Sequence, residues 1–572
     1  MKISYTYIIY GLFLTLFSGC ELIHDDPAEL GFREDGEAYA YVSLTINTAP
    51  TAPGTRANPT GGEAGDGYED GQTYEKAVNN LTLFFYESQA GNATDGVNRT
   101  DNPAIVARAN IPITPPGALE DDTERIDEVY RVGPVRVSGL RMNHFYHVLA
   151  VANAGESFGS SITDLDGLKA ATIETVYSYS NNVYSNFVMS SEGDESPVLN
   201  ITYENSENNP ATTTVDLERL VARVDYRVGK NADTSFEVGD NTVTATITRA
   251  MLVNMYNQNT YVLKRVASDI NGTPDYLDDE TYNNYVIDPN TSQKTLPSNH
   301  GDWYGHYFPS LSDANSTTWE AWLTTGDPIK DPEDANAETW YRLGYPKENT
   351  SSVDAQGRYY STGVVFEASY SGIPNVTNGS TFFRYKGTIY PTLEAAMNAT
   401  YDDAYFNENQ EFESFEVLTQ YINSLPGDED PAGYKDYLKT ATSDNFNGSQ
   451  WTWDYYKQNV LQFAANEQGE YTVATAETRK ALHDRGYGTE TFLNGRGYYI
   501  YWIRHNGGDN ATQFDETKPM AYGIVRNNVY KLTVNSISKI GDDTPGGNAT
   551  LDILVAVKNW QELPGDEVEW KN

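Results

Sequence analysis

Cysteine is almost absent from this sequence, since Cys20 is the single one among 572 residues. The chain therefore cannot form an internal disulfide, and it has no second thiol for a metal site or a nucleophile. Positive charge is also scarce, because 39 Lys and Arg residues face 81 Asp and Glu residues, which gives a net charge of -42. Such a chain repels nucleic acid and anionic membranes at long range, so we expect neither as a partner.

Long helix-forming runs are few, whereas aromatic residues are plentiful: the chain has 43 Tyr, 20 Phe and 9 Trp. A high content of aromatic and β-branched residues, with many Ser, Asn and Gly residues between them, is typical of β-sheet proteins. The length would allow about four average domains, or two large β-sandwiches. We therefore predict a mostly β fold.

Patterns that indicate catalysis are missing as well. The sequence contains no Gly-x-Ser-x-Gly elbow, P-loop, Rossmann glycine pattern or His-Glu-x-x-His motif. His144 and His147 are three residues apart in a strand-like run, which puts them on opposite faces. His300 and His306 are more typical of surface histidines than of metal ligands. We predict that the protein is not an enzyme and has no cofactor and no metal site.

The N-terminal segment has the layout of a bacterial lipoprotein signal. An apolar stretch over residues 7–17, too short to span a bilayer stably, is followed by Leu-Phe-Ser-Gly-Cys. We expect residues 1–19 to be a signal peptide and Cys20 to carry the acyl chains that anchor a precursor in the outer membrane. The alternative is a plain signal peptide with an incidental cysteine. Asp25 and Asp26 resemble a signal for sorting to the outer face.

A strand and an exposed basic residue follow the lipid site. Residues 39–46 alternate, and one face carries Ala40, Val42, Leu44 and Ile46. From Asn47 to Gly71 the chain is rich in Thr, Ala, Pro and Gly, which predicts an exposed loop with Arg56 in its middle. A cut there would detach the strand and the lipid anchor from the body. The sheet would then keep a vacant edge and an apolar groove.

The C-terminus ends in a second strand of the same kind. Leu551, Ile553, Val555 and Val557 alternate with the residues between them, and no further element follows to hold this apolar segment in place. The groove of another copy would bury it. Head-to-tail repetition of this contact does not close, so it would build a filament.

Between these ends we expect two modules with a boundary near Lys230. Strands are predicted over residues 78–88, 130–140, 144–154, 212–228, 241–256, 495–506 and 522–541, and helices over residues 162–176, 391–406 and 415–425. Two aromatic runs, "WTWDYY" (residues 451–456) and "GYYIYW" (residues 497–502), could stack on sugar rings. A monomeric glycan-binding surface lipoprotein is therefore the alternative function. It depends mainly on "WTWDYY", which we expect in a loop. Alternation in "GYYIYW" instead predicts an ordinary strand, with Tyr498, Ile500 and Trp502 on one sheet face and Tyr499 and Tyr501 on the other.

Several motifs together resemble the Bacteroidetes fimbrillins, in particular the Mfa1-type major fimbrial subunit, a type V pilin. They are the lipobox, "YVSLTI" before "GTRANPTGG", "LERLVARVDYRV", "GIVRNNVYKLTVNSISKIG" and the closing "ILVAVKNWQELP". The resemblance implies two transthyretin-like β-sandwich domains with Greek-key strands and a few short helices. It places them at residues 57–230 and 231–549, the second with a large Tyr- and Asn-rich insertion over about residues 268–494.

The resemblance also implies a processing route and a set of partners. The precursor, with residues 20–56 as its propeptide, would be cut between Arg56 and Ala57 by an Arg-specific protease. Residues 550–572 would then be donated to another copy in an adhesive surface fimbria completed by tip and anchor fimbrillins. Arg33 is a rival site, although a cut there would open no groove. The turn "DDTPGGNA" is short where the family has a long Pro-rich spacer, so the last strand could instead fold back, as in a tip or anchor subunit.

Overall fold

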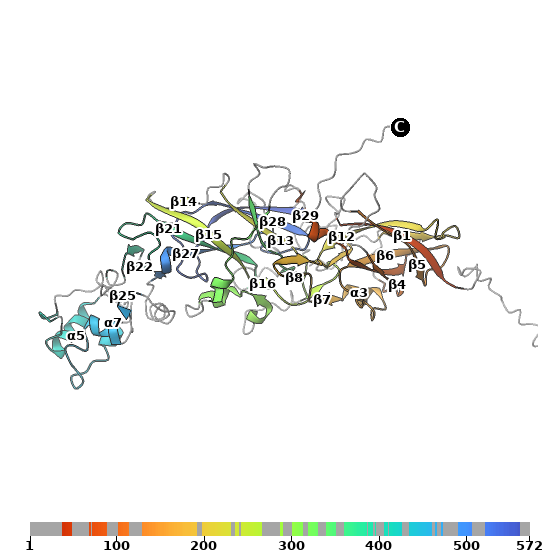
Figure 1. Ribbon diagram of the computed structural model, residues 1–572. Coiled ribbons are helices and arrows are strands. Elements are labelled where there is room, and N and C mark those ends of the chain that lie inside the picture. The colour runs from red at the N-terminus through yellow and green to blue at the C-terminus, as the bar shows by residue number, and fades with distance from the viewer. Residues whose placement is uncertain are drawn as a thin grey trace, which may run out of the picture.

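The computed structural model describes residues 37–560 with gaps, of which the main ones are 49–67, 89–100, 114–128, 266–285, 290–299, 473–489 and 506–520. The molecule is elongated, with a first β-sandwich at one end, a second in the middle and a small helical part at the other end (Figure 1). The predicted mostly β fold is confirmed. No helix among the described residues is long and apolar enough to cross a membrane.

The first sandwich is one sheet folded over a single core. Its strand order is β4-β3-β6-β10-β12-β1-β5, and β11 pairs with β6. The bounds are β1 Tyr39–Asn47, β3 Asn80–Glu87, β4 Ile105–Pro112, β5 Val129–Ser138, β6 His144–Ala152, β10 Met189–Ser191, β11 Val198–Ile201 and β12 Ala211–Arg219. Strand β12 links two halves of this sheet, since its first residues pair with β1 and its last ones with β10. The half that holds β1 and β5 faces the half that holds β10, β6, β3 and β4. Apolar side chains from both halves fill the space between them.

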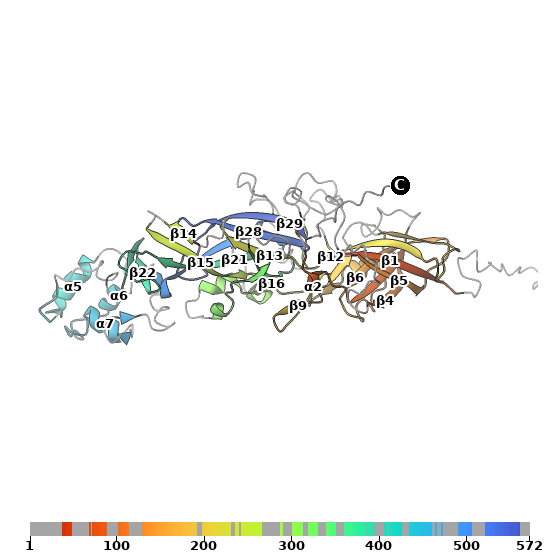
Figure 2. The ribbon, with the colours of Figure 1, turned by 45° about the horizontal axis from the view of Figure 1, so that its top comes forward.

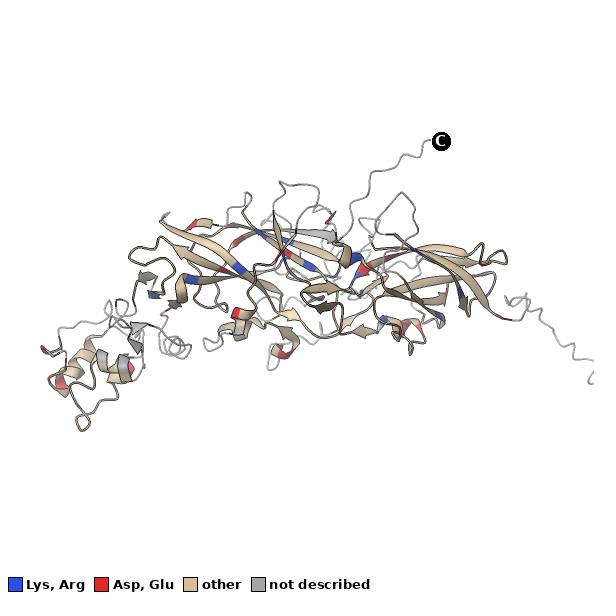
Figure 3. Ribbon diagram, in the orientation of Figure 1, with Lys and Arg blue, Asp and Glu red and all other residues tan. Residues whose placement is uncertain are grey.

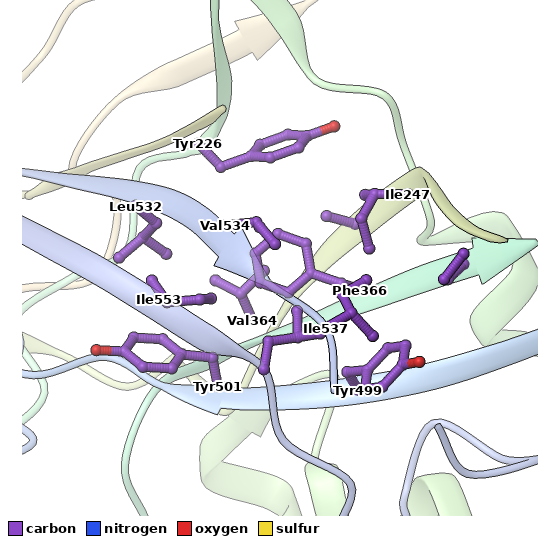
Figure 4. Close-up of a cluster of buried hydrophobic side chains, with 14 of the residues drawn as sticks. Tyr226, Ile247, Val364, Phe366, Tyr499, Tyr501, Leu532, Val534, Ile537 and Ile553 are labelled. Atoms are coloured by element: carbon purple, nitrogen blue, oxygen red, sulfur yellow. The ribbon is translucent and has the colours of Figure 1, made fainter. Parts of the chain in front are cut away.

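The second sandwich packs two sheets against each other. One has the order β19-β20-β13-β28-β29-β2 and the other β14-β15-β21-β27. The bounds are β2 Tyr68–Glu69, β13 Arg223–Val228, β14 Ser235–Val238, β15 Val243–Val253, β19 Asp327–Ile329, β20 Trp340–Gly344, β21 Gly363–Ser371, β27 Arg496–Trp502, β28 Asn528–Ser536 and β29 Asp552–Trp560. Tyr499 and Tyr501 from β27 and Ile553 from β29 belong to the one cluster of buried side chains between these sheets (Figure 4).

The strand predicted from the alternation in "GYYIYW" is confirmed as β27, and both of its faces have apolar contacts. Tyr499 and Tyr501 lie in the core between the two sheets. Tyr498 and Ile500 point the other way, into a cluster covered by two short 3-10 helices, η5 (Phe308–Ser312) and η6 (Thr318–Ala321). This aromatic run is therefore core rather than a stacking surface.

The helical part is an insertion between β23 (Thr388–Tyr390) and β26 (Glu490–Phe492), which both pair with β22 (Phe382–Tyr385). Its helices are α5 (Phe415–Ser424), α6 (Tyr434–Leu438) and α7 (Trp453–Asn459), and they lie at the end of the molecule away from the first sandwich (Figure 2). The predicted helix over residues 415–425 is confirmed as α5, whose Ser414 caps the first turn by accepting from Val417 N. The one predicted over residues 391–406 falls mainly outside the described residues.

Two predicted elements differ in length from the observed ones. The helix expected over residues 162–176 is only α3 (Leu165–Lys169), because Thr172 and Ile173 leave it to form β7, which pairs with β17 (Thr260–Tyr261). The strand expected over residues 212–228 is broken into β12 and β13, which belong to different sandwiches. The chain thus crosses between them at residues 220–222, ahead of the boundary expected near Lys230.

The remaining elements are short. They are β8 Ser178–Ser180 with β9 Val183–Ser185, β16 Met255–Tyr256 with β18 Tyr304–Gly305, β24 Ala464–Ala465 with β25 Tyr471–Thr472, the helix α2 Thr73–Lys76, and the 3-10 turns η4 His300–Trp303 and η9 Leu493–Gly495. Of these, α2 bears on the site, because it lies where the two sandwiches meet.

Candidate functional site

The N-terminal strand β1 is inserted between two other strands of the first sandwich. It runs parallel to β12, with Val42 beside Ala211 and Ile46 beside Val215. On its other side it runs antiparallel to β5, from Tyr39 beside Ser138 onwards. Its main-chain groups are therefore paired along both edges, so removing β1 would leave β5 and β12 facing a slot one strand wide.

The inward face of β1 is part of the core. Ala40, Val42, Leu44 and Ile46 are 0–2% exposed, whereas the residues between them are half-buried. Burial of three side chains the size of Val, Leu and Ile contributes about 5–9 kcal/mol as an upper estimate. The strand is thus held by apolar contacts and main-chain pairing, without any covalent link except the chain that leaves its two ends.

Gly133 adapts β5 to β1. The pairing shifts between Val42 and Leu44, so that β5 bulges opposite Ser43. Gly133 adopts a φ of +109°, and a Cβ on it would lie 2.5 Å from the carbonyl oxygen of Val42. Only glycine combines this left-handed conformation with so close an approach. The bulge fixes how β1 sits on its neighbour.

Surface contacts hold the beginning of β1 in place. Arg136 on β5 forms an ion pair with Glu37 at 2.7 Å, and its guanidinium lies 3.9 Å from the centroid of the Tyr39 ring. The amide of Gly139 donates to the carbonyl oxygen of Ala38 at 2.8 Å. These groups are partly exposed, so each contact contributes little beside the buried face.

The chain after β1 does not remain exposed at either end of the predicted loop. Asn47 and Thr48 are buried. Tyr68 and Glu69 form β2, which pairs in parallel with Asn559 and Trp560 of β29. The expected exposed loop from Asn47 to Gly71 is thus wrong at its ends, because main-chain pairing orders residues that composition alone assigns to a loop. Arg56, Ala57 and Cys20 lie outside the described residues.

A buried charge cluster anchors the chain just after that loop. Arg223 on β13 contacts Glu75 of α2 at 3.1 Å, Asp225 at 3.0 Å and Glu69 of β2 at 3.4 Å. Lys531 on β28 also contacts Glu69, at 2.7 Å. Acidic and basic positions meet here, where the two sandwiches join (Figure 3). Glu69 lies on β2, next to β29, whereas its partners lie on β28 and β13. Its side chain therefore reaches across β29.

Burial sets the protonation of this cluster. Loss of solvent raises the pKa of Asp225 to about 6, although Arg223 and Lys531 act in the opposite direction. Burial also raises the pKa of Tyr345, and the neighbouring Glu75, which accepts a hydrogen bond from the Tyr345 hydroxyl, raises it further. Arg223 remains charged, because Asp225, Glu75 and Glu69 together outweigh its desolvation and raise its pKa. The cluster is a structural anchor in which Arg223 keeps its charge while Asp225 titrates at a raised pKa.

The predicted C-terminal strand is paired within its own chain. β29 runs antiparallel to β28, with Val555 beside Leu532 and Val557 beside Tyr530. Leu551, Ile553 and Val555 are 6–8% exposed, so they are less completely buried than the inward face of β1. Among the described residues, β2 alone pairs with the far edge of β29, and only at Asn559 and Trp560. β29 is therefore an edge strand over most of its length.

The other sequence candidates are structural. Trp451 and Tyr456 are buried in the core of the helical part, and "WTWDYY" leads into α7, so its expected loop setting is wrong. His147 is buried and stacks on Tyr86, while His306 donates from Nδ1 to the carbonyl oxygen of Leu252. No group of three or more potential metal ligands comes together within the described part of the chain.

Sequence reasoning missed Gly133 and the charge cluster. A Gly-Pro pair inside a predicted strand is a signal for a bulge, and it could have drawn attention to Gly133. Glu69 and Glu75 carry no such signal among 81 acidic residues. Only the fold brings them to Arg223, which is more than 140 residues away in the sequence.

Comparisons with known proteins agree with the resemblance at the C-terminus. Residues 490–565, which include β27, β28 and β29, match the family model of the major fimbrial subunit protein type IV, fimbrillin, C-terminal. The search of curated proteins returned no significant match.

Similar solved structures cover most of the chain at low identity. A putative cell adhesion protein from Parabacteroides distasonis is 12% identical, with a TM-score of 0.39, and the match covers 91% of this chain and all of that one (100%). The tip fimbrial protein Mfa3 from Porphyromonas gingivalis is 10% identical (TM-score 0.34; 91% and 100% covered). The fimbrilin FimA from the same species is 12% identical (TM-score 0.34; 92% and 99% covered).

Proposed function

We propose that this chain, which ends in a fimbrillin-type C-terminal segment, is a structural subunit of a bacterial surface fimbria that supports adhesion and biofilm formation. It is exported as a lipoprotein acylated at Cys20 and cut between Arg56 and Ala57 by an Arg-specific protease. The released propeptide takes β1 with it. Subunits then join by donor-strand exchange, in which a C-terminal strand from another copy enters the vacated slot, and tip and anchor fimbrillins complete the fibre.

The observation that carries this proposal is the placement of β1. A strand that is paired on both edges and buried on its inner face belongs to the core, yet it is joined to the rest of the molecule through a segment that contains a basic residue. One cut at Arg56 would leave β1 held by non-covalent contacts alone. Its loss would expose an apolar groove and two unpaired strand edges, which a second strand would cover.

The state of β29 is compatible with its role as donor. Over Asp552–Lys558, β28 is its one partner strand within the described part of the chain, and Leu551, Ile553 and Val555 lie at the border of the core. An edge strand can detach from a sandwich at a lower cost than an interior one, because fewer main-chain hydrogen bonds break. We infer that the fold-back pairing of β29 is the monomeric state, and that assembly replaces it with pairing in the slot of the next subunit.

The second candidate function is that of a terminal subunit of the fimbria, and the pairing of β29 with β28 favours it. If β29 stays on β28, the chain can accept a strand after processing but cannot donate one, as a tip or anchor subunit would. The glycan-binding alternative loses its main support, because Trp451 and Tyr456 are buried.

Cleavage of the purified precursor with an Arg-specific protease tests the proposal. We expect SDS-resistant ladders from the wild type, none from Arg56→Ala, and undiminished ladders from Arg33→Ala as the matched control. Ladders from uncleaved Arg56→Ala would contradict the gating role of the propeptide. A single addition to a processed partner subunit, without ladders, would indicate the terminal position instead.

A further inference from the structure

Resting on the proposed function, we propose that the slot left by β1 accepts the β29 segment of a second copy in the direction opposite to that of β1. The observation that carries this inference is the order of side-chain sizes along the slot and along β29. The backbone arrangement of β5 and β12 is compatible with it.

The side chains that fill the slot increase in size along β1. From the N-terminus to the C-terminus they are Ala40, Val42, Leu44 and Ile46, and each is 0–2% exposed. Because such tightly filled positions leave little free volume, the empty slot would keep a narrow end where Ala40 lay and a wide end where Ile46 lay.

The inward side chains of β29 run in the other order. Leu551 and Ile553 come first and Val555 follows, all three directed into the core of the second sandwich. The sequence continues the same alternation with Val557. The strand is thus wide at its beginning and narrower at its end.

The two size orders match only in the reversed direction. Leu551 then takes the position of Ile46, Ile553 that of Leu44 and Val555 that of Val42, each with a side chain of similar volume. The excess volume is confined to Val557, which takes the position of Ala40. Inserted in the same direction as β1, Leu551 would have to fit where Ala40 lay, which overpacks the narrow end. Val555 would take the position of Leu44, and its smaller side chain would leave a void there.

The backbone of the slot does not oppose this direction. Since β1 is parallel to β12 and antiparallel to β5, the two flanking strands are antiparallel to each other. Any strand between them is therefore parallel to one and antiparallel to the other. The reversed strand gains the antiparallel pairing with β12, whose register is regular from Val42 to Asn47, while the bulge at Gly133 lies on the β5 side. Side-chain volume thus decides the direction.

Engineered disulfides can establish the direction in which the donor strand is inserted. Thr214 on β12 is exposed and lies beside Thr45 of β1. In the reversed direction Asp552 of the donor takes the place of Thr45, whereas in the same direction Ala556 takes it. We would combine Thr214→Cys with either Asp552→Cys or Ala556→Cys in a Cys20→Ser background, which leaves the engineered pair as the only thiols.

After cleavage and mild oxidation, we expect intermolecular disulfides in the ladders of the Asp552→Cys pair and not in those of the Ala556→Cys pair. Disulfides only in the Ala556→Cys pair, in both pairs or in neither pair, within ladders that do form, would overturn the proposed direction while leaving the fimbrial function intact. If none of the variants, including the Cys20→Ser parent, forms ladders, the proposed function itself fails, and the direction with it.

A volume-conserving variant gives a second readout without cysteines. Exchanging the ends of the donor, with Leu551→Val and Val557→Leu together, keeps its total volume but moves a large side chain to the end that would meet the narrow end of the slot. We expect at least a several-fold lower yield of ladders than from the wild type. An unchanged or higher yield would contradict the reversed direction.

Discussion

The fit of β1 in its slot depends on Gly133 having no side chain. Its φ is +109°, and a Cβ there would lie only 2.5 Å from the Val42 carbonyl oxygen, so no other residue type fits without movement of β1. We expect Gly133→Ala to destabilise the precursor by about 1–3 kcal/mol in chemical denaturation. Gly387→Ala is the matched control, because Gly387 also has a positive φ but open space around it. Equal losses in both would show that contact with β1 contributes nothing.

Asp225 makes the stability of the precursor depend on pH, and a substitution can isolate this contribution. Its pKa is raised to about 6 by burial, above its ordinary value of 3.8, so between these values the folded state binds more protons than the unfolded state. Stability from this group is therefore greatest below pH 4 and is lost as the pH rises to about 6, by up to about 3 kcal/mol. We expect denaturation curves of Asp225→Asn, compared with the wild type at pH 4 and pH 7, to lack this component. The same pH dependence in both proteins would refute it.

Among the elements, β1 is a replaceable part of the first sandwich. A synthetic peptide with the sequence of Tyr39–Asn47, added during cleavage, should occupy the slot and shorten or abolish the ladders. The same peptide with Leu44→Asp should not compete, because a carboxylate would have to enter a site that is 2% exposed. Gel electrophoresis of cleavage reactions with increasing peptide measures the effect. Equal inhibition by both peptides would mean that binding in the slot does not depend on the inward-facing side chains of the strand.

Across the full length of the subunit, the two sandwiches are joined by apolar contacts, and a buried ion pair of the second sandwich lies beside them. Arg526, just before β28, contacts Glu348 at 2.7 Å and donates to the carbonyl oxygen of Val262 at 2.9 Å, and both charged side chains are 0% exposed. A shared apolar cluster lies beside them, with Leu149 from the first sandwich and Val529 from the second. The junction thus buries apolar side chains from both sandwiches in one cluster.

Glu348→Gln tests that junction. It leaves the Arg526 guanidinium buried without its counter-charge, which should cost about 3–5 kcal/mol of unfolding free energy. Asp436→Asn removes a solvent-exposed ion pair with Lys439 and should change stability by less than about 0.5 kcal/mol. Thermal denaturation of the two variants beside the wild type provides the measurement. Similar small effects of both would mean that the buried pair does not stabilise the joint.

Local alternation and composition were enough to predict several features of this protein. The mostly β fold, the buried alternation of β1 and the strand in "GYYIYW" could be read from the sequence, because a strand shows its period of two whatever surrounds it. Long-range packing instead settled which strands lie beside β1, that Gly133 must accommodate it, and that β29 rests on β28. Those facts depend on contacts between residues tens to hundreds of positions apart, such as Glu69 with Lys531, and one sequence carries no periodic signal for such pairs. For the same reason α3 ended early, since the pairing of Thr172 with a distant strand outweighed the helical pattern.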